Sequence, residues 1–402
     1  DFDRADVYAL ALDPQDLDVL YAATEGGLYK TMDGGVSWFP TGSGLPSTAV
    51  DTLLVDDTGT VYAGVLPAGV YRSDDGGKTW VASDEGIDLK SMQGERSLLL
   101  LEPVKRQRLY YTHGRGLWSS DDGGLSWSLI SETPCGFTAA LALAPSALSS
   151  VTGQAPTDAS IVYQATMAQN PPQETCQEGL FRSVDGGQTW EAINHGLEGM
   201  LERLREAKGA DIFSGLGGVR DDSPRNYWSL FAGASESSTN RGDRSVSPHN
   251  YWSLAVSPSM PQTLYASGLA GQRFYRSTDG GETWQDVIEH GCVSLIVHPQ
   301  YGNRVFCHDG RQFRYSMDSG TQWDYHPKLS HQTPFGDIVV LVVSPADPDV
   351  FYAGTSGGDF SPPAAIYRST AAGRGDWAPL GSGFGRMPVE LAVDPADGVY
   401  LY

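Results

Sequence analysis

The stretch Ser73-Asp-Asp75-Gly-Gly-Lys-Thr-Trp80 decides the fold, because the same pattern returns along the whole chain. An Asp-Gly-Gly sequence between two strands indicates a tight hairpin, since glycine adopts positive φ at no steric cost. The aspartate can accept hydrogen bonds from N–H groups of its own turn, and the closing tryptophan can bury a large ring between sheets. We call this pattern the box. Its seven copies contain Asp33 and Trp38, Asp75 and Trp80, Asp122 and Trp127, Asp185 and Trp190, Asp279 and Trp284, Asp318 and Trp323, and, in a decayed form, Trp377.

A second pattern, an apolar segment with a shared leucine, precedes each box. An aromatic strand follows that segment, and a third strand such as Gly69-Val-Tyr-Arg72 leads into the box. Each repeat therefore predicts four short antiparallel strands, with the box at the third turn. Such units cannot bury both faces alone, and arranging them radially around an axis solves that problem. The shared leucines are Leu10, Leu53, Leu99, Leu141, Leu254, Leu295, Leu341 and Leu391.

The sequence thus predicts an all-β fold: a single β-propeller domain over residues 1–402, built from four-stranded antiparallel blades. The two patterns disagree about the number of blades. The eight leucine segments favour eight blades, the last of them incomplete because one further strand follows residues 389–394 before Tyr402. The seven boxes give seven blades as the alternative.

The spacing of the boxes indicates one long insertion. Trp190 and Trp284 are 94 residues apart, whereas the other neighbouring box tryptophans are 39 to 63 residues apart. We assign the excess to a link between blades, residues 192–250, and predict that it binds a partner, since aromatic and arginine side chains are typical interface anchors. A structural cap over the ring and a blade without a box are the alternatives. The predicted binding residues are Phe213, Arg220, Arg225, Tyr227, Trp228, Phe231, Arg241 and Arg244.

The charge of the chain is strongly unbalanced, with 49 acidic and 27 basic residues and a formal net charge of −22. This charge disfavours nucleic acid and anionic lipid as partners, because both need a basic surface. It fits a basic partner or bound cations, although many of the aspartates are explained by the repeated turns. No segment approaches the run of about 18 apolar residues that a membrane span needs, so no span is expected.

The four cysteines suggest disulfides. We predict a bridge between Cys135 and Cys176, because both are expected at the same face of one blade. A bridge between Cys292 and Cys307 is less favoured, since their register in a shared hairpin is off by about three residues. Disulfides form in oxidising compartments. A secreted or cell-surface location is therefore expected, with the periplasm or an organelle lumen as alternatives.

The carboxylates have both structural and chemical interpretations. The box aspartates are spread around the ring and cannot converge on one substrate, so we interpret them as groups that brace turns. Asp13, Asp16 and Asp18 share one turn, where calcium is the alternative interpretation. The histidines show no metal-ligand spacing, and we predict neither a metal nor another cofactor. Glycoside hydrolysis needs two facing carboxylates, and the inner strands offer Asp51 with Glu390 as the pair.

Through its boxes the chain resembles the Asp-box (BNR-repeat) propeller superfamily. Members include sialidases, xyloglucanase-type glycoside hydrolases, sortilin-type receptors and the photosystem II assembly factor. The resemblance implies the propeller fold but no single function. Sialidases carry one essential arginine in an Arg-Ile-Pro motif, which this sequence lacks. Xyloglucanase-type enzymes place their two carboxylates across a cleft between two propellers, whereas one propeller is predicted here.

We therefore expect a non-enzymatic scaffold, secreted or at a cell surface, that binds a protein partner or holds a place in a surface assembly. One alternative is a glycan-binding module or a glycoside hydrolase of the sialidase-like kind. Another is an assembly factor for a membrane complex of the photosynthetic type.

Overall fold

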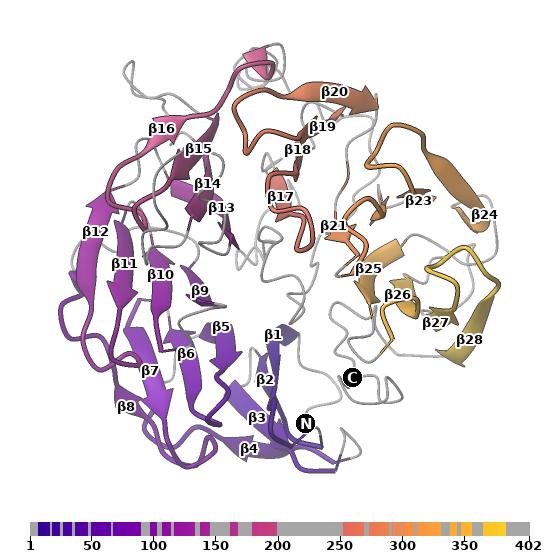
Figure 1. Ribbon diagram of the computed structural model, residues 1–402. Coiled ribbons are helices and arrows are strands. Elements are labelled where there is room, and N and C mark those ends of the chain that lie inside the picture. Colours follow the sequence, from indigo (N-terminus) through magenta and orange to yellow (C-terminus); the bar gives the residue numbers. More distant parts are fainter. Residues whose placement is uncertain are drawn as a thin grey trace, which may run out of the picture.

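The computed structural model is a ring of antiparallel β-sheets (Figure 1). It describes residues 7–382 except 17, 25–26, 34–36, 47–49, 66, 90–96, 103–106, 114–115, 133–136, 145–160, 168–178, 199–251, 269–272, 289–291, 293, 299, 309–311, 331–337, 344–346 and 356–364. Among these residues no helix has the length and hydropathy needed to span a bilayer.

The described residues form seven four-stranded sheets, each with its strands in chain order. We number the sheets as blades 1–7. The first strand of each blade lies nearest the centre and the fourth strand forms the outer edge (Figure 1). Blade 1 contains β1 (Val7–Leu12), β2 (Leu20–Thr24), β3 (Gly27–Thr31) and β4 (Phe39–Thr41); blade 2 contains β5 (Val50–Val55), β6 (Val61–Val65), β7 (Gly69–Ser73) and β8 (Val81–Ala82); blade 3 contains β9 (Ser97–Leu101), β10 (Leu109–His113), β11 (Gly116–Ser120) and β12 (Ser128–Glu132).

The remaining blades follow the same plan. Blade 4 contains β13 (Phe137–Ala144), β14 (Ile161–Met167), β15 (Gly179–Ser183) and β16 (Glu191–Ala192); blade 5 contains β17 (Trp252–Val256), β18 (Leu264–Gly268), β19 (Arg273–Ser277) and β20 (Gln285–Ile288). Blade 6 contains β21 (Ser294–Val297), β22 (Val305–His308), β23 (Gln312–Ser316) and β24 (Asp324–Ser330); blade 7 contains β25 (Ile338–Val343), β26 (Phe351–Thr355), β27 (Ala365–Ser369) and β28 (Trp377–Ser382).

The propeller fold is confirmed, and the number of blades in the described part follows the boxes. Each of the seven boxes lies between the third and fourth strands of its own blade, as Asp75 does between β7 and β8. Seven blades match the alternative count rather than the favoured eight. The eighth leucine segment, residues 389–394, lies outside the described residues. An apolar strand pattern is less specific than a box, because any buried strand satisfies it, whereas the box prescribes one turn.

The hydrophobic core lies between blades rather than inside any one of them. The shared leucines whose side chains are described are buried, as are the aromatic residues of the second strands. One cluster joins Leu54, Tyr62 and Val70 of blade 2 to side chains of blade 3 that include Tyr111 and Trp127. Burying such side chains stabilises the fold by roughly 1.5–3 kcal/mol each. Because each cluster combines side chains of two neighbouring blades, each blade needs its neighbours in the ring to bury its apolar side chains.

Blades 4 and 5 pack directly on each other despite the long separation of their boxes. The Trp284 N–H donates to the carbonyl of His195, with 2.9 Å between nitrogen and oxygen. Leu197 and Leu254 belong to one buried cluster. This packing disfavours a blade without a box at this point of the ring. The insertion within residues 192–250 stays a prediction, because residues 199–251 lie outside the described part.

Candidate functional site

Each intact box engages its aspartate in its own turn. In box 2, Asp75 Oδ1 accepts hydrogen bonds from Thr79 N and Ser73 Oγ, both at 2.9 Å. Asp75 Oδ2 accepts one from the Thr79 hydroxyl at 2.6 Å. The Thr79 hydroxyl is the largest cause that lowers the pKa of Asp75 to about 2. A carboxylate held ionised in this way is a poor general acid or base near neutral pH. The geometry supports the interpretation that these aspartates brace turns.

In blades 2 to 5 the box tryptophan is hydrogen-bonded to the preceding blade. The backbone N–H of Trp80 donates to Ser43 O at 2.9 Å, and that of Trp127 donates to Glu85 O at 2.8 Å. The indole N–H of Trp127 also donates to Ser83 O at 2.6 Å. The box tryptophans are therefore seam residues. Trp80, Trp127, Trp284 and Trp377 are buried, whereas Trp38, Trp190 and Trp323 are half-buried.

A glycine in the preceding link makes this approach possible. Gly44, Gly86 and Gly196 have φ values of +98°, +96° and +96°. A Cβ on any of them would lie under 3.0 Å from the carbonyl oxygen of the box tryptophan that it faces. Our sequence analysis did not identify these glycines. The signal that could have revealed them is a repeated glycine followed by leucine or isoleucine, as in Gly44-Leu45 and Gly86-Ile87.

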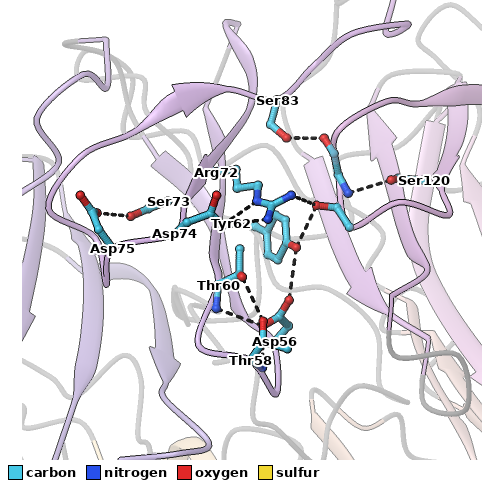
Figure 2. Close-up of polar contacts among 12 residues, drawn as sticks. Asp56, Thr58, Thr60, Tyr62, Arg72, Ser73, Asp74, Asp75, Ser83 and Ser120 are labelled. Carbon is cyan, nitrogen blue, oxygen red and sulfur yellow. Dashed lines mark hydrogen bonds and ion pairs between the residues drawn. The ribbon is translucent and has the colours of Figure 1, made fainter.

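Basic side chains also join neighbouring blades, because each donates to a backbone carbonyl in the box of the next blade. Arg72 and the hydroxyl of Tyr62 both donate to the carbonyl of Gly123 in the next box, at 2.8 and 2.9 Å (Figure 2). Arg182 donates to Gly280 O at 2.9 Å in the seam between blades 4 and 5. Lys30 and Arg276 make corresponding contacts in other seams. In blades 1, 2, 4 and 5 the basic residue directly before the first residue of the box thus binds the next box, a role that the sequence analysis missed.

Asp51, the described member of the nominated catalytic pair, is engaged in a seam. Its carboxylate accepts hydrogen bonds from Ser97 N at 2.7 Å and from Ser97 Oγ at 2.9 Å. These bonds join the inner strand of blade 2 to that of blade 3. Glu390 lies outside the described residues. In the described residues Asp51 therefore holds two inner strands together, and its pairing with Glu390 stays a prediction.

The turn proposed for calcium forms bonds within itself. Asp13 Oδ1 accepts from Gln15 N at 2.9 Å, and Asp16 Oδ1 accepts from Asp18 N at 3.2 Å. Within the described ranges, no group of three or more histidine, cysteine, aspartate or glutamate side chains could hold a metal ion. Calcium at this turn stays a prediction without support from the geometry.

Large apolar side chains are exposed to solvent on the outer surface of blades 1–3. They lie in the boxes and on the fourth strands, β4, β8 and β12. Val81 and Ala82 lead into Ser83, whose hydroxyl donates to the carbonyl of Gly124, the neighbour of Leu125. This bond joins the link after β8 to the box of blade 3, so Val81 and Leu125 lie on the two sides of the same seam. We call it the rim: Met32, Phe39, Val81, Leu125 and Leu129, with exposed fractions between 52% and 63%.

The rim is confined to one sector of the ring. In blade 4 the box tryptophan is followed by Glu191 and the small Ala192, and in blade 5 by Gln285 and Asp286. All four residues are exposed, and none has a large apolar side chain. Beyond the rim, the large exposed apolar side chains of the described residues are Leu89, Tyr301 and Tyr325. Contiguous exposed apolar surface marks interaction sites in soluble proteins. The sequence showed these residues, but exposure depends on the neighbouring blades and had to be observed.

The recurring box has a counterpart among known protein families. The BNR/Asp-box repeat matches residues 71–82 and 275–286, which hold the boxes of blades 2 and 5. The chain is an Asp-box β-propeller. A curated relative, a xyloglucanase from Paenibacillus sp, is 26% identical over 388 residues, which are 84% of this chain and 36% of the relative. The chain thus spans about a third of the length of that enzyme.

Solved structures share the architecture of this Asp-box propeller. The GH74 xyloglucanase from Xanthomonas campestris has a TM-score of 0.50 at 16% identity, over 96% of this chain and 62% of the enzyme. YCF48 bound to a D1 peptide has a TM-score of 0.51 at 14% identity, over 87% of this chain and 90% of YCF48. At these identities the likeness shows the fold alone.

The disulfide predictions for this Asp-box propeller have different outcomes. The less favoured bridge, Cys292–Cys307, is present, with a Cα–Cα distance of 5.7 Å. Cys307 pairs with Leu295 in the ladder, so the register is offset as expected. Cys292 precedes β21 and is not held in the ladder, which lets it approach Cys307. Cys135 and Cys176, like all the predicted binding residues of the insertion, lie outside the described residues.

Proposed function

We propose that this Asp-box propeller is a non-enzymatic scaffold that binds a protein partner in an extracellular or other oxidising compartment. The rim carries the proposal, because it gathers large apolar side chains in solvent on three adjacent blades. Partner-binding surfaces have such an apolar centre with a polar border. The peptide held by the similar YCF48 propeller supports a protein ligand. The Cys292–Cys307 disulfide supports the compartment.

A glycoside hydrolase is the second candidate, favoured by the Paenibacillus xyloglucanase. Glycosidases need two facing carboxylates, and in this chain Asp51 is occupied by Ser97. The test is release of reducing ends from xyloglucan by the wild-type chain and by Asp51→Asn. We expect the two proteins to match a blank without enzyme. Hydrolysis by the wild type that Asp51→Asn abolishes would favour the hydrolase over the scaffold.

The binding test uses the rim and a matched position elsewhere. A photo-crosslinking amino acid in place of Val81 should capture the partner in the native source, whereas the same residue in place of Gln285 in blade 5 should not. Mass spectrometry identifies the captured protein. A subunit of a photosynthetic membrane complex would favour the assembly-factor alternative, which the likeness to YCF48 motivates.

The purified partner then measures what the rim contributes. We expect the variant Phe39→Ser/Val81→Ser/Leu129→Ser to bind at least about tenfold more weakly than the wild type, since central apolar anchors dominate binding energy. The control is Tyr325→Ser, which removes an exposed aromatic side chain from blade 6 and should bind normally. Equal affinity of the rim variant and the wild type would refute the proposal.

A further inference from the structure

We infer that the rim recognises a basic segment of a protein, in which lysine or arginine residues flank apolar anchors. This inference rests on the protein-binding function proposed above and adds the chemistry of the partner. The rim offers the surface for the apolar anchors. The carboxylates around the rim favour lysine or arginine beside those anchors.

The negative charge of the chain is concentrated in the half that contains the rim. Residues 1–198, which include blades 1–4, contain 27 acidic and 11 basic residues, a formal charge of −16. Residues 199–402 contain 22 acidic and 16 basic residues, a formal charge of −6. A basic partner is therefore attracted toward blades 1–4 before it makes contact, whereas an acidic partner is repelled.

Two rim blades carry a second carboxylate in the box. Asp74 precedes Asp75 in blade 2, and Asp121 precedes Asp122 in blade 3, whereas blades 4, 5 and 6 have Val184, Thr278 and Met317 at this position. The side chains of Asp74 and Asp121 are 64% and 67% exposed. Their partners Arg72 and Arg108 are 18% and 20% exposed. The carboxylate of each pair thus faces solvent beside the rim, and the guanidinium lies beneath it.

The other border of the rim is acidic as well. Val81 and Ala82 are followed in the same link by Glu85 and Asp88, which are both exposed. Leu125, on the far side of the seam, lies between Asp122 and Ser126. Burial opposes ionisation of Asp122, but hydrogen bonds from Ser126 and Ser120 hold its pKa at about 2. An apolar surface with fixed negative charge on two sides fits apolar side chains with cations around them.

Synthetic peptides of twelve residues test this chemistry directly. The first combines lysine with leucine, the second replaces each lysine by glutamate, and the third replaces each leucine by serine. Binding is followed by fluorescence anisotropy with the full chain. We expect the lysine–leucine peptide to bind at least about tenfold more tightly than either of the others, and more weakly as salt increases.

Variants of the chain locate the binding. Val81→Ser/Leu125→Ser/Leu129→Ser should weaken the lysine–leucine peptide about tenfold, and Asp74→Asn/Asp121→Asn/Glu85→Gln should weaken it and reduce its salt dependence. The control Tyr325→Ser should bind normally. All substituted side chains are exposed, so the variants should fold, which circular dichroism verifies.

The outcomes separate this inference from the proposed function. If the glutamate–leucine peptide binds as tightly as the lysine–leucine peptide and the apolar variant loses this binding, the basic chemistry of the partner is refuted, and the rim remains a docking surface. If the lysine–serine peptide binds as tightly as the lysine–leucine peptide and the apolar variant does not change this, the inference is refuted, because the binding is then unspecific charge attraction. A captured partner whose contact segment is acidic would overturn it too, while the crosslink at position 81 would still support the scaffold.

Discussion

Replacing Gly86 by alanine should open the seam between blades 2 and 3. Gly86 has a φ of +96°, and its added Cβ would lie under 3.0 Å from the Trp127 carbonyl oxygen. The backbone conformation alone costs alanine about 1 kcal/mol. Relief of the overlap moves the link away from Trp127, lengthens the hydrogen bond from Trp127 N to Glu85 O, and costs roughly 1–3 kcal/mol more. We expect a loss of about 3 kcal/mol in the free energy of unfolding.

The matched control is Gly59→Ala. Gly59 has a φ of +82°, but the atoms nearest to its added Cβ are 3.7 Å and 4.0 Å away. This variant carries the conformational cost without the overlap, so we expect a loss of about 1 kcal/mol. Equilibrium denaturation in urea, followed by tryptophan fluorescence, measures both variants against the wild type. Equal losses would refute the seam argument, because the Trp127 contact would then contribute nothing beyond backbone strain.

Three further predictions concern other turns and seams. His298 Nδ1 accepts two backbone N–H groups, from Gln300 and Tyr301; burial, with help from Arg304, lowers its pKa despite Asp349 at 3.7 Å. The contribution of His298 to stability is therefore full above the ordinary pKa of 6.5 and is lost as pH falls through the lower folded pKa. Urea midpoints should fall with pH in that range for the wild type and fall less steeply for His298→Asn, whose amide oxygen accepts hydrogen bonds but does not titrate. Ser319, at a φ of 61°, takes the place of the first box glycine, so Ser319→Gly should stabilise blade 6 by about 0.5–1 kcal/mol. Gly280 has a φ of 74° at the same position of blade 5, so Gly280→Ser should destabilise that blade by about as much. Unchanged thermal midpoints in both variants would contradict this. Arg182 is buried and bonded to Gly280 O, Glu191 and Glu282, so Arg182→Gln should lower the free energy of unfolding by about 2–3 kcal/mol. Faster hydrogen exchange at the Trp284 N–H would report the opening of the seam between blades 4 and 5. The control Arg374→Gln changes an exposed side chain and should have little effect.

The fold was predictable because its deciding signal is local. Asp75 accepts two hydrogen bonds from Thr79 within one turn, and Gly76 and Gly77 supply the positive φ that the turn needs, so the turn can be inferred from these residues alone. The Cys292–Cys307 bridge was harder to predict, because register arguments hold within a ladder and Cys292 precedes β21. The roles of the seam glycines and arginines were missed because their partners are backbone carbonyls of another blade; the repeated glycine before leucine or isoleucine marks the glycines but does not show what they face.

The same seams explain why the boxes reveal the fold and not the function. In the seams between blades 1 and 2, 2 and 3, and 4 and 5, a tryptophan N–H and a basic side chain donate to backbone carbonyls, and a glycine faces the tryptophan carbonyl, so these contacts do not depend on the side chains that follow the tryptophan. Those positions, such as Val81 and Gln285, point away from the seams into solvent and can differ from blade to blade. Information about partners should therefore reside on the fourth strands and the outer residues of the boxes. This is where blades 1–3 depart from blades 4 and 5, and where substitutions should change binding without opening the ring.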